Sequence, residues 1–217
     1  MQIRTFTGGG FGENAYLAVC DVTGACVAVD PGAGAPMLVQ ALESEGLDLQ
    51  AILLTHAHLD HIEGVSEVRA AAPDVPIWLH PDDFELYRGV QRQAAMFGLS
   101  IDSQPEPTDE LVPGVSFDFG GCTFDISFAP GHAPGHVIFL SPADAIALVG
   151  DVVFQGSIGR TDLPGGDFQT LMASIRREIL SLPDETLLYP GHGPATTVGR
   201  ERLTNPFLTP HYGGELA

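Results

Sequence analysis

The chain has 217 residues, of which 44% are hydrophobic, so it is long enough to bury a core and fits one globular domain. Its 28 acidic and 9 basic residues give a formal net charge of −19, and such an acidic surface repels phosphate backbones, which argues against a nucleic acid partner. The apolar runs are far shorter than the roughly 20 residues of a membrane helix, and the N-terminus has no signal-peptide pattern. We expect a cytoplasmic protein without a membrane partner, as a monomer or small homo-oligomer.

The first half of the chain alternates strand-like and helix-like segments. The opening strands should form an antiparallel meander that ends at the turn "DPGAG", and Gly46 should stop the first helix. The expected segments are strands over 3–6, 15–19 and 26–29, a helix over 35–45, a strand over 51–55, a helix over 62–71, a strand over 76–80, and one or two helices over 82–97 interrupted near Gly89.

The second half repeats this order of strands followed by a helix. Residues 100–114 are rich in proline and acid and are expected to form a surface connection. The segments that follow are strands over 115–119, 123–129, 136–141 and 145–150, a helix over 168–180, a strand over 186–190, and a short helix that runs toward Asn205. Two sheets packed between outer helices would bring the histidine loops of both halves to one edge.

The segment "THAHLDH" places three histidines and one aspartate within six positions after a buried strand. His56 and His58 are two residues apart, so an extended backbone points both side chains the same way. Asp60 and His61 lie past a turn and can face a second point. Imidazole and carboxylate groups suit zinc, iron or manganese. The spacing therefore predicts half of each of two adjacent metal sites.

Three later loops carry further candidate ligands. They are His132 in "FAPGHAPGH", Asp151 in "ALVGD" and His192 in "LLYPGHGP". Each follows an apolar run and lies beside glycine, which lets backbone segments approach closely. We expect these three residues to complete the sites begun by "THAHLDH".

"THAHLDH" followed in order by "GH", "GD" and "PGH" loops resembles the metallo-β-lactamase-fold hydrolases, and most closely the small glyoxalase II-like thioester hydrolases. "GRTDLPGGD", "SLPDETLLYPGHGPATTVGRER" and "NPF" also match, so the resemblance covers nearly the whole chain. It implies an α+β fold, a four-layer αββα sandwich, in a single domain over 1–217. The C-terminal helical domain with which larger glyoxalase II enzymes contact glutathione is expected to be absent.

The resemblance also implies a site with two divalent metal ions, for which zinc is expected and iron or manganese are alternatives. It assigns His56, His58 and His132 to the first metal, Asp60, His61 and His192 to the second, and Asp151 as the bridge between them. Two such metals share a water and lower its pKa, so a bridging hydroxide is the expected nucleophile toward a thioester such as S-lactoylglutathione. Asp60 is expected to orient this hydroxide and carry its proton.

Arg160, in "GSIGRTD", occupies the place where glyoxalase II enzymes have a basic residue that binds the glutathione carboxylate, so it is the expected substrate-binding residue. The competing interpretation is a solvated arginine or an ion pair with Asp162.

Four other residues near these motifs have less specific roles. His136 is expected to support the ligands or the structure without binding metal. Asp30, in "VDPG", either hydrogen-bonds a ligand histidine or caps its own turn. His80 precedes a helix start and is not expected to be catalytic, and His211 is expected to be solvated.

Two other activities remain open for this resemblance. A mononuclear Fe(II) persulfide dioxygenase shares the fold and a "GRTD" segment, but "PGHGPATT" favours the hydrolases. A metal-dependent lactonase would use the same hydroxide. β-Lactamases of this fold usually have cysteine at position 151 and flavodiiron proteins usually have glutamate at position 58, so both activities are disfavoured. A non-catalytic binding module is disfavoured because all seven ligands are present.

Overall fold

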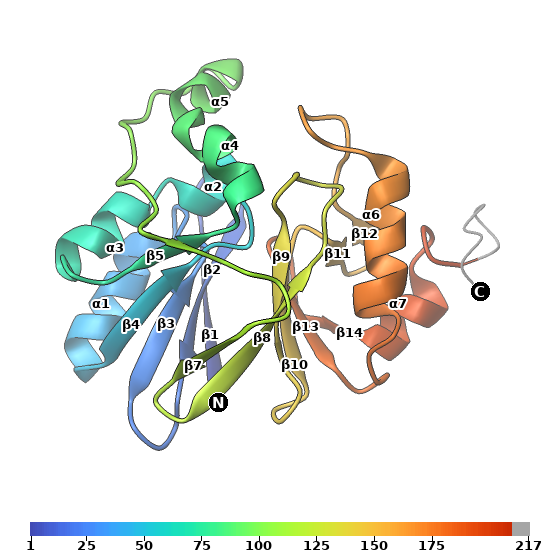
Figure 1. Ribbon diagram of the computed structural model, residues 1–217, viewed down its shortest axis with the longest axis horizontal. Coiled ribbons are helices and arrows are strands. Elements are labelled where there is room, and N and C mark those ends of the chain that lie inside the picture. The colour runs from blue at the N-terminus through green and yellow to red at the C-terminus, as the bar shows by residue number, and fades with distance from the viewer. Residues whose placement is uncertain (210–217) are drawn as a thin grey trace.

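Two mixed β-sheets face each other in the middle of the molecule, and helices cover the outer side of each (Figure 1). The computed structural model describes residues 1–209. The layers follow the order helix, sheet, sheet, helix, so the predicted four-layer αββα fold is confirmed.

The first sheet has the strand order β1-β2-β3-β4-β5-β6. Its first three strands pair antiparallel, as the predicted meander requires, and the later neighbours pair parallel. Parallel neighbours need crossover connections, which the helices of this half supply. The strands are β1 Gln2–Gly8, β2 Glu13–Val19, β3 Ala25–Val29, β4 Asp48–Leu53, β5 Ile77–Leu79 and β6 Asp109–Glu110.

The second sheet has the strand order β14-β13-β10-β9-β8-β7. Only the β10–β13 pair is parallel among these neighbours. A separate two-stranded hairpin, β11 with β12, follows the Asp151 loop. The strands are β7 Ser116–Phe119, β8 Cys122–Phe128, β9 Val137–Ser141, β10 Ile146–Gly150, β11 Val153–Phe154, β12 Ser157–Ile158, β13 Leu187–Pro190 and β14 Thr196–Thr197.

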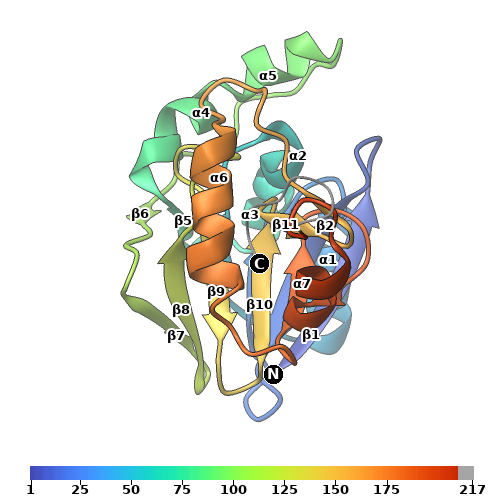
Figure 2. The ribbon, with the colours of Figure 1, turned by 90° about the vertical axis from the view of Figure 1, so that its right-hand side faces the viewer.

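Helices flank both sheets and the upper edge of the first (Figures 1 and 2). α1 ends at Gly46, whose φ of 61° is left-handed and whose N–H bonds to Leu42 O, so the predicted stop is confirmed. α6 continues into a π-helical turn at Ile175–Ile179. The helices are α1 Ala35–Glu45, α2 Leu59–Ile62, α3 Val65–Ala71, α4 Phe84–Arg88, α5 Val90–Met96, α6 Phe168–Ser174 and α7 Val198–Thr204.

Strand periodicity divides the core into three apolar layers. Along β2, Leu17 packs toward α1, whereas the next side chains on either side point between the sheets. Phe124 and Phe139 meet at a ring distance of 6.0 Å in that central layer. Because the central strands β2, β3, β9 and β10 are buried along almost their whole length, the middle of each sheet is held firmly, and the loops at this edge are well placed to carry a site.

Two segments differ from the sequence prediction. The helix expected over 62–71 is split into α2 and α3 at Gly64, where an added Cβ would lie 2.3 Å from the carbonyl oxygen of Gly32. The connection expected over 100–114 contains β6, which pairs with β5 at the sheet edge. Both differences depend on tertiary contacts that local patterns do not reveal.

Among residues 1–209, every helix is too short or too polar to serve as a membrane span.

Candidate metal centre

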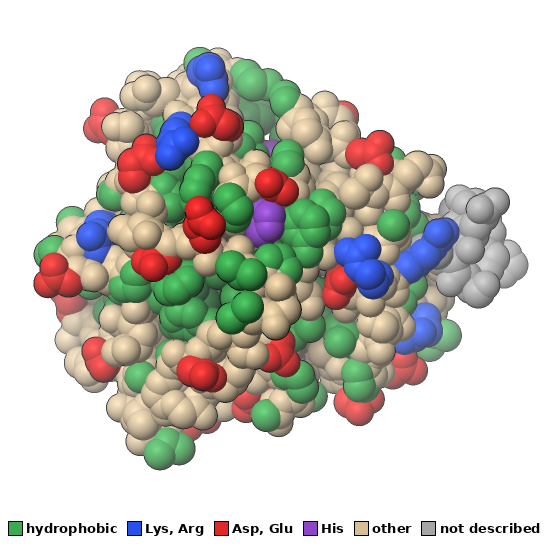
Figure 3. Space-filling view, in the orientation of Figure 1, with side chains coloured by type: hydrophobic (Ala, Val, Ile, Leu, Met, Phe, Trp, Pro, Cys, Tyr) green, Lys and Arg blue, Asp and Glu red, His purple; other side chains and the backbone are tan. Residues whose placement is uncertain are grey.

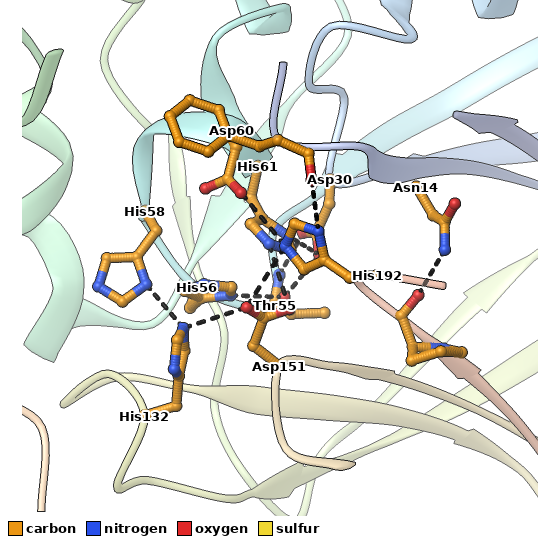
Figure 4. Close-up of polar contacts among 12 residues, drawn as sticks. Asn14, Asp30, Thr55, His56, His58, Asp60, His61, His132, Asp151 and His192 are labelled. Carbon is orange, nitrogen blue, oxygen red and sulfur yellow. Dashed lines mark hydrogen bonds and ion pairs between the residues drawn. The ribbon is translucent and has the colours of Figure 1, made fainter. Parts of the chain in front are cut away.

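Polar side chains from four loops converge at the edge where β4, β8, β10 and β13 end (Figure 4). The loop after β4 runs into α2, so its ligand candidates come partly from an extended segment and partly from the first helical turn. His58 is the extended residue immediately before α2. The structure therefore separates the two halves of "THAHLDH" as the spacing predicts.

The first cluster consists of His56, His58 and His132, whose nearest ligand atoms all lie within 4.8 Å of one another. His58 Nδ1 and His132 Nε2 are 2.7 Å apart (Figure 4). All three side chains are buried. Three imidazoles facing one point form a donor set typical of zinc or another transition metal.

The second cluster consists of Asp60, His61 and His192, again with ligand atoms within 4.8 Å. His192 Nε2 lies 3.2 Å from Asp60 Oδ2. The cluster lies beside the first, as the ring distance of 4.1 Å between His56 and His61 shows.

Asp151 lies between the clusters. Its Oδ1 is 3.3 Å from His61 Nε2, and its Oδ2 is 3.4 Å from His132 Nε2 and 3.6 Å from His192 Nε2. The Asp151 carboxylate thus faces both groups, which is the position expected of a bridging ligand. All seven residues expected to be ligands meet at this centre.

Four of the five histidines have a hydrogen-bond acceptor at the ring nitrogen that points away from the centre, which fixes which nitrogen carries the proton; the outward Nε2 of His58 has none within the described residues. In four of the five histidines, Nδ1 is held in this way and Nε2 faces the centre; in His58, Nδ1 faces it. The pairs are His56 with Thr55 Oγ1 at 3.0 Å, His61 with Asp30 Oδ2 at 3.0 Å, His132 with Arg160 O at 2.8 Å and His192 with Phe11 O at 3.2 Å.

Several nitrogen and oxygen atoms that could bind a metal at the centre have no hydrogen-bond partner. Within the described residues, His56 Nε2, His61 Nε2 and Asp151 Oδ1 are buried and make no hydrogen bond. An unpaired buried polar atom costs about 1–3 kcal/mol, so three of them converging on one place need a common partner. The residues present fit a pair of divalent metal ions, each with imidazole and carboxylate ligands.

The electrostatics of the centre keep negative charge on the carboxylates. Burial opposes the charge on Asp151, but His61 and His132 outweigh it and hold the pKa of Asp151 far below its ordinary value. Burial likewise disfavours the charged form of His61, yet the carboxylates of Asp151 and Asp60 raise the pKa of His61 well above its ordinary value. The carboxylates thus attract positive charge, which a metal cation can supply in place of the proton.

The first cluster behaves differently. Burial, followed by the neighbouring histidines, lowers the pKa of His56 well below its ordinary range, and burial and His132 lower the pKa of His58 to about 3. These imidazoles are neutral at physiological pH, which is the form that binds metal.

The residues with less specific predictions can now be placed. Asp30 accepts hydrogen bonds from Thr55 N at 2.7 Å and Thr55 Oγ1 at 2.6 Å and also faces His61, so the ligand-supporting alternative is the one observed. His136 Nε2 accepts a hydrogen bond from Asp151 N at 3.1 Å and holds the backbone of Asp151 in place. His80 caps the turn at Pro81–Asp83 through Asp82 N. His211 lies outside the described residues.

Two buried residues of the site were missed in the sequence. Asp83 accepts hydrogen bonds from Ala57 N at 2.9 Å and Gly135 N at 2.6 Å. The carboxylate of Glu13, 1% exposed, has no hydrogen-bond partner within the described residues, and burial raises its pKa well above the ordinary value. In the sequence Asp83 resembles an ordinary helix-start aspartate, and Glu13 lies in a strand, so neither carried a local signal.

A cavity of about 310 Å³ opens above the centre. His58, Asp60, His132, Asp151 and His192 form its polar lining, and Arg160 also lines it. The Arg160 guanidinium pairs with Asp162 through hydrogen bonds of 2.7 and 2.8 Å. Arg160 therefore lies where a substrate-binding residue is expected and also makes the ion pair that was the competing interpretation.

Comparison with known proteins places the chain in a family. Hydroxyacylglutathione hydrolase GloC of Haemophilus influenzae is 39% identical over 210 residues, which cover 96% of this chain and 98% of that protein. The probable metallo-hydrolase YqgX of Bacillus subtilis is 38% identical over 209 residues, with coverage of 96% and 98%.

Two solved structures are also similar to this chain in sequence and fold. The crystal structure of TTHA1623 in a di-iron-bound form is 45% identical with a TM-score of 0.86, covering 94% of this chain and all of that chain (100%). The crystal structure of BLEG-1 B3 metallo-beta-lactamase is 39% identical with a TM-score of 0.89, covering 96% and 100%. Residues 8–192 also match the family model described as the Metallo-beta-lactamase superfamily, and the chain belongs to that superfamily.

Proposed function

We propose that the protein is a dinuclear metal-dependent hydrolase of small-molecule thioesters, with S-lactoylglutathione as a representative substrate. The observation that carries this proposal is the position of Asp151, whose two carboxylate oxygens face both ligand clusters. His56, His58 and His132 would hold one metal, Asp60, His61 and His192 the other, and Asp151 both. Similarity to a hydroxyacylglutathione hydrolase supports the thioester class.

Two divalent metals held by these residues would supply an acidified water and stabilise negative charge on a carbonyl oxygen. The protein's own residues position the attacking water. Asp60 lines the cavity, and its carboxylate can accept a hydrogen bond from the attacking water and so orient it. His61 and the hydrogen bond from His192 overcome the effect of burial and lower the pKa of Asp60, which keeps it ionised. Because a thiolate is a good leaving group, the reaction needs no dedicated general acid.

The identity of the metal belongs to the proposal as well. Zinc suits the imidazole-rich first cluster, whereas the related TTHA1623 has been crystallised in a di-iron-bound form. Imidazole and carboxylate ligands accept both metals, so availability decides. Metal analysis of the purified protein is expected to give two metal ions per chain; one iron per chain would instead favour the persulfide dioxygenase.

The test is thiol release from S-D-lactoylglutathione by metal-loaded protein. The His58→Ala variant and a chelator-treated sample should both lose the activity, whereas Asp74→Ala, at an exposed aspartate remote from the ligand loops, should retain it. Absence of thiol release from protein that holds two metal ions per chain would refute the proposal. Oxygen uptake with glutathione persulfide and ring opening of lactones would then be measured.

β-Lactam hydrolysis is a second candidate, because a B3 metallo-beta-lactamase structure is 39% identical to this chain. A thioester and a β-lactam both present an activated carbonyl to the same centre. A chromogenic cephalosporin assayed beside the thioester decides between them: we expect thioester hydrolysis to dominate, and a higher kcat/KM for the cephalosporin would reverse the assignment.

A further inference from the structure

The cavity above the metal centre has an apolar wall that the hydrolytic chemistry itself does not use. Its side chains come from the turn between β1 and β2, from α2 and α5, from the β11–β12 hairpin and from the loop before α6. These lining residues are Phe11, Leu59, Phe97, Phe154, Ile158 and Leu163. Large apolar side chains gathered at a pocket mark a surface that binds an apolar group.

Two phenylalanines form the outer part of this wall. Phe11 and Phe97 meet edge to face at a ring distance of 5.2 Å, although they come from distant parts of the chain. They remain 37% and 45% exposed. Exposed aromatic rings that line a cavity leave apolar area that a ligand can bury.

The inner part of the wall touches the metal centre. Phe154 packs edge to face on the His192 ring at 5.8 Å. An apolar group that contacts Phe154 would therefore lie next to the place where the reacting carbonyl must be. The space-filling view shows hydrophobic side chains at the upper edge of the molecule, around α5 (Figure 3).

The α5 side of the wall is fixed to the ligand loop by Gln93. The Gln93 amide donates to Ala57 O and Leu86 O, both at 2.9 Å, and its oxygen accepts from Leu59 N at 3.0 Å. Phe97, one turn further along, is therefore positioned relative to His58 before any substrate binds. A preorganised wall discriminates between ligands better than a mobile one.

Positive charge is scarce in the same cavity. Arg160 is the one arginine among its lining residues, and Asp162 neutralises it through two hydrogen bonds. The side chains that line the cavity thus offer an anionic thiol carrier such as glutathione little attraction. A cavity of about 310 Å³ lies at the lower end of the range of roughly 300–1,000 Å³ that is typical of ligand sites, and it has room for a short acyl chain or an aryl group.

Building on the proposed function, we propose that the preferred substrates are thioesters with an uncharged, apolar acyl group, which packs against Phe11, Phe97 and Phe154 while the thiol carrier lies outside the cavity. Phe11, Phe97 and Phe154 then determine specificity through the acyl chain. Lactoyl, which is small and hydroxylated, would be accepted but would leave the wall unfilled.

The test compares acetyl, butanoyl and hexanoyl thioesters of N-acetylcysteamine, an uncharged thiol, with S-lactoylglutathione, using metal-loaded protein. kcat/KM is expected to rise about fourfold for each added methylene that is buried. Phe97→Ala and Phe11→Ala should reduce this dependence on chain length, so that their loss of activity grows from acetyl to hexanoyl. Phe168→Ala, at a phenylalanine that is also 45% exposed but does not line the cavity, should leave the dependence unchanged.

Binding of the hydrolysis-resistant thioethers S-methyl- and S-hexyl-N-acetylcysteamine, measured by calorimetry with and without metal, gives a second readout. The hexyl compound should bind more tightly to the wild type, and Phe97→Ala should remove the difference. Hydrolysis of all thioesters at rates independent of chain length would overturn this inference and leave the proposed function intact. Hydrolysis of none of them, lactoylglutathione included, would overturn both.

Discussion

The Asp83 carboxylate accepts a hydrogen bond from the backbone amide of Ala57 at 2.9 Å, between two histidines expected to bind metal. Its other oxygen accepts from Gly135 N at 2.6 Å, in the loop that carries His132. One buried side chain thus connects the first sheet's histidine loop to the second sheet's. Asp83 thus holds together the two loops that form the first cluster.

Replacing Asp83 by alanine should therefore loosen both loops at once. Burial raises the pKa of Asp83 to about 6, so above this pH the side chain is a carboxylate anion whose two oxygens both accept hydrogen bonds. Alanine leaves two buried amides unpaired, at about 1–3 kcal/mol each, and a lost supporting contact typically weakens metal binding by about 10–100-fold. Denaturant unfolding of metal-free protein and metal titration by calorimetry measure the two effects.

Asp82→Ala is the matched control, because Asp82 is the exposed neighbour of Asp83. It should change stability by less than about 0.5 kcal/mol and leave metal affinity unchanged. Equal effects of the two substitutions would show that Asp83 does not connect the loops in the way described.

The convergence of the seven residues expected to be ligands was predictable because their signal is local. In the seven residues of "THAHLDH", the two-residue spacing of His56 and His58 and the later position of His61 indicate which side chains point together. The strand ends of a two-sheet fold then place the loops at one edge. The fold followed from alternating strands and helices and from the family resemblance.

The supporting residues could not be found in this way. Asp83 is 26 positions from Ala57 and 52 from Gly135, and its hydrogen bonds exist only once the two sheets have packed. The pairing of Phe11 with Phe97 likewise joins segments that no periodicity relates. Strand β6 was missed for the same reason, since its pairing with β5 depends on a partner rather than on its own composition.

Metal binding should stabilise the fold strongly. His56 Nε2, His61 Nε2 and Asp151 Oδ1 make no hydrogen bond within the described residues, and a bound metal would give them a common partner. A ligand at roughly 100 times its Kd stabilises the folded state by ~2.7 kcal/mol per site. Thermal unfolding with and without divalent zinc or iron should show a higher Tm with metal. Asp151→Ala should lose most of this increase, and Asp74→Ala should keep it.

Arg160 and Asp162 should set how well an anionic thiol carrier is tolerated. Asp162 forms an ion pair with the Arg160 guanidinium, and an exposed ion pair of this kind contributes at most about 1 kcal/mol of stabilisation. Asp162→Asn should free Arg160 and lower KM for S-lactoylglutathione by up to about fivefold, whereas Arg160→Gln should raise it. Neither variant should alter KM for the N-acetylcysteamine thioesters; a parallel change with both carriers would exclude recognition of the carrier by Arg160.

His136 should make the metal-free protein sensitive to acid. Its Nε2 accepts from Asp151 N at 3.1 Å, so the ring must be unprotonated at that nitrogen, and its side chain is fully buried. Burial, followed by the charge of neighbouring histidines, lowers the pKa of His136 well below its ordinary value. Below about pH 6.5 the imidazole of His136 is protonated in the unfolded chain but stays neutral in the folded state. The stability contributed by neutral His136 is thus present above that pH and is lost as the pH falls.

The size of the effect follows from linkage. A group that stays neutral in the folded state loses about 1.4 kcal/mol per pH unit, or ~2 kcal/mol between about pH 6.5 and 5. His136→Gln keeps an acceptor for Asp151 N but cannot be protonated, so although less stable near neutrality it should lose about 2 kcal/mol less than the wild type over this interval. Denaturant unfolding of both chelator-treated proteins at the two pH values measures the difference. Equal losses would mean that His136 takes up its proton as readily in the folded state as in the unfolded chain, and the hydrogen bond to Asp151 N would then not hold the ring neutral.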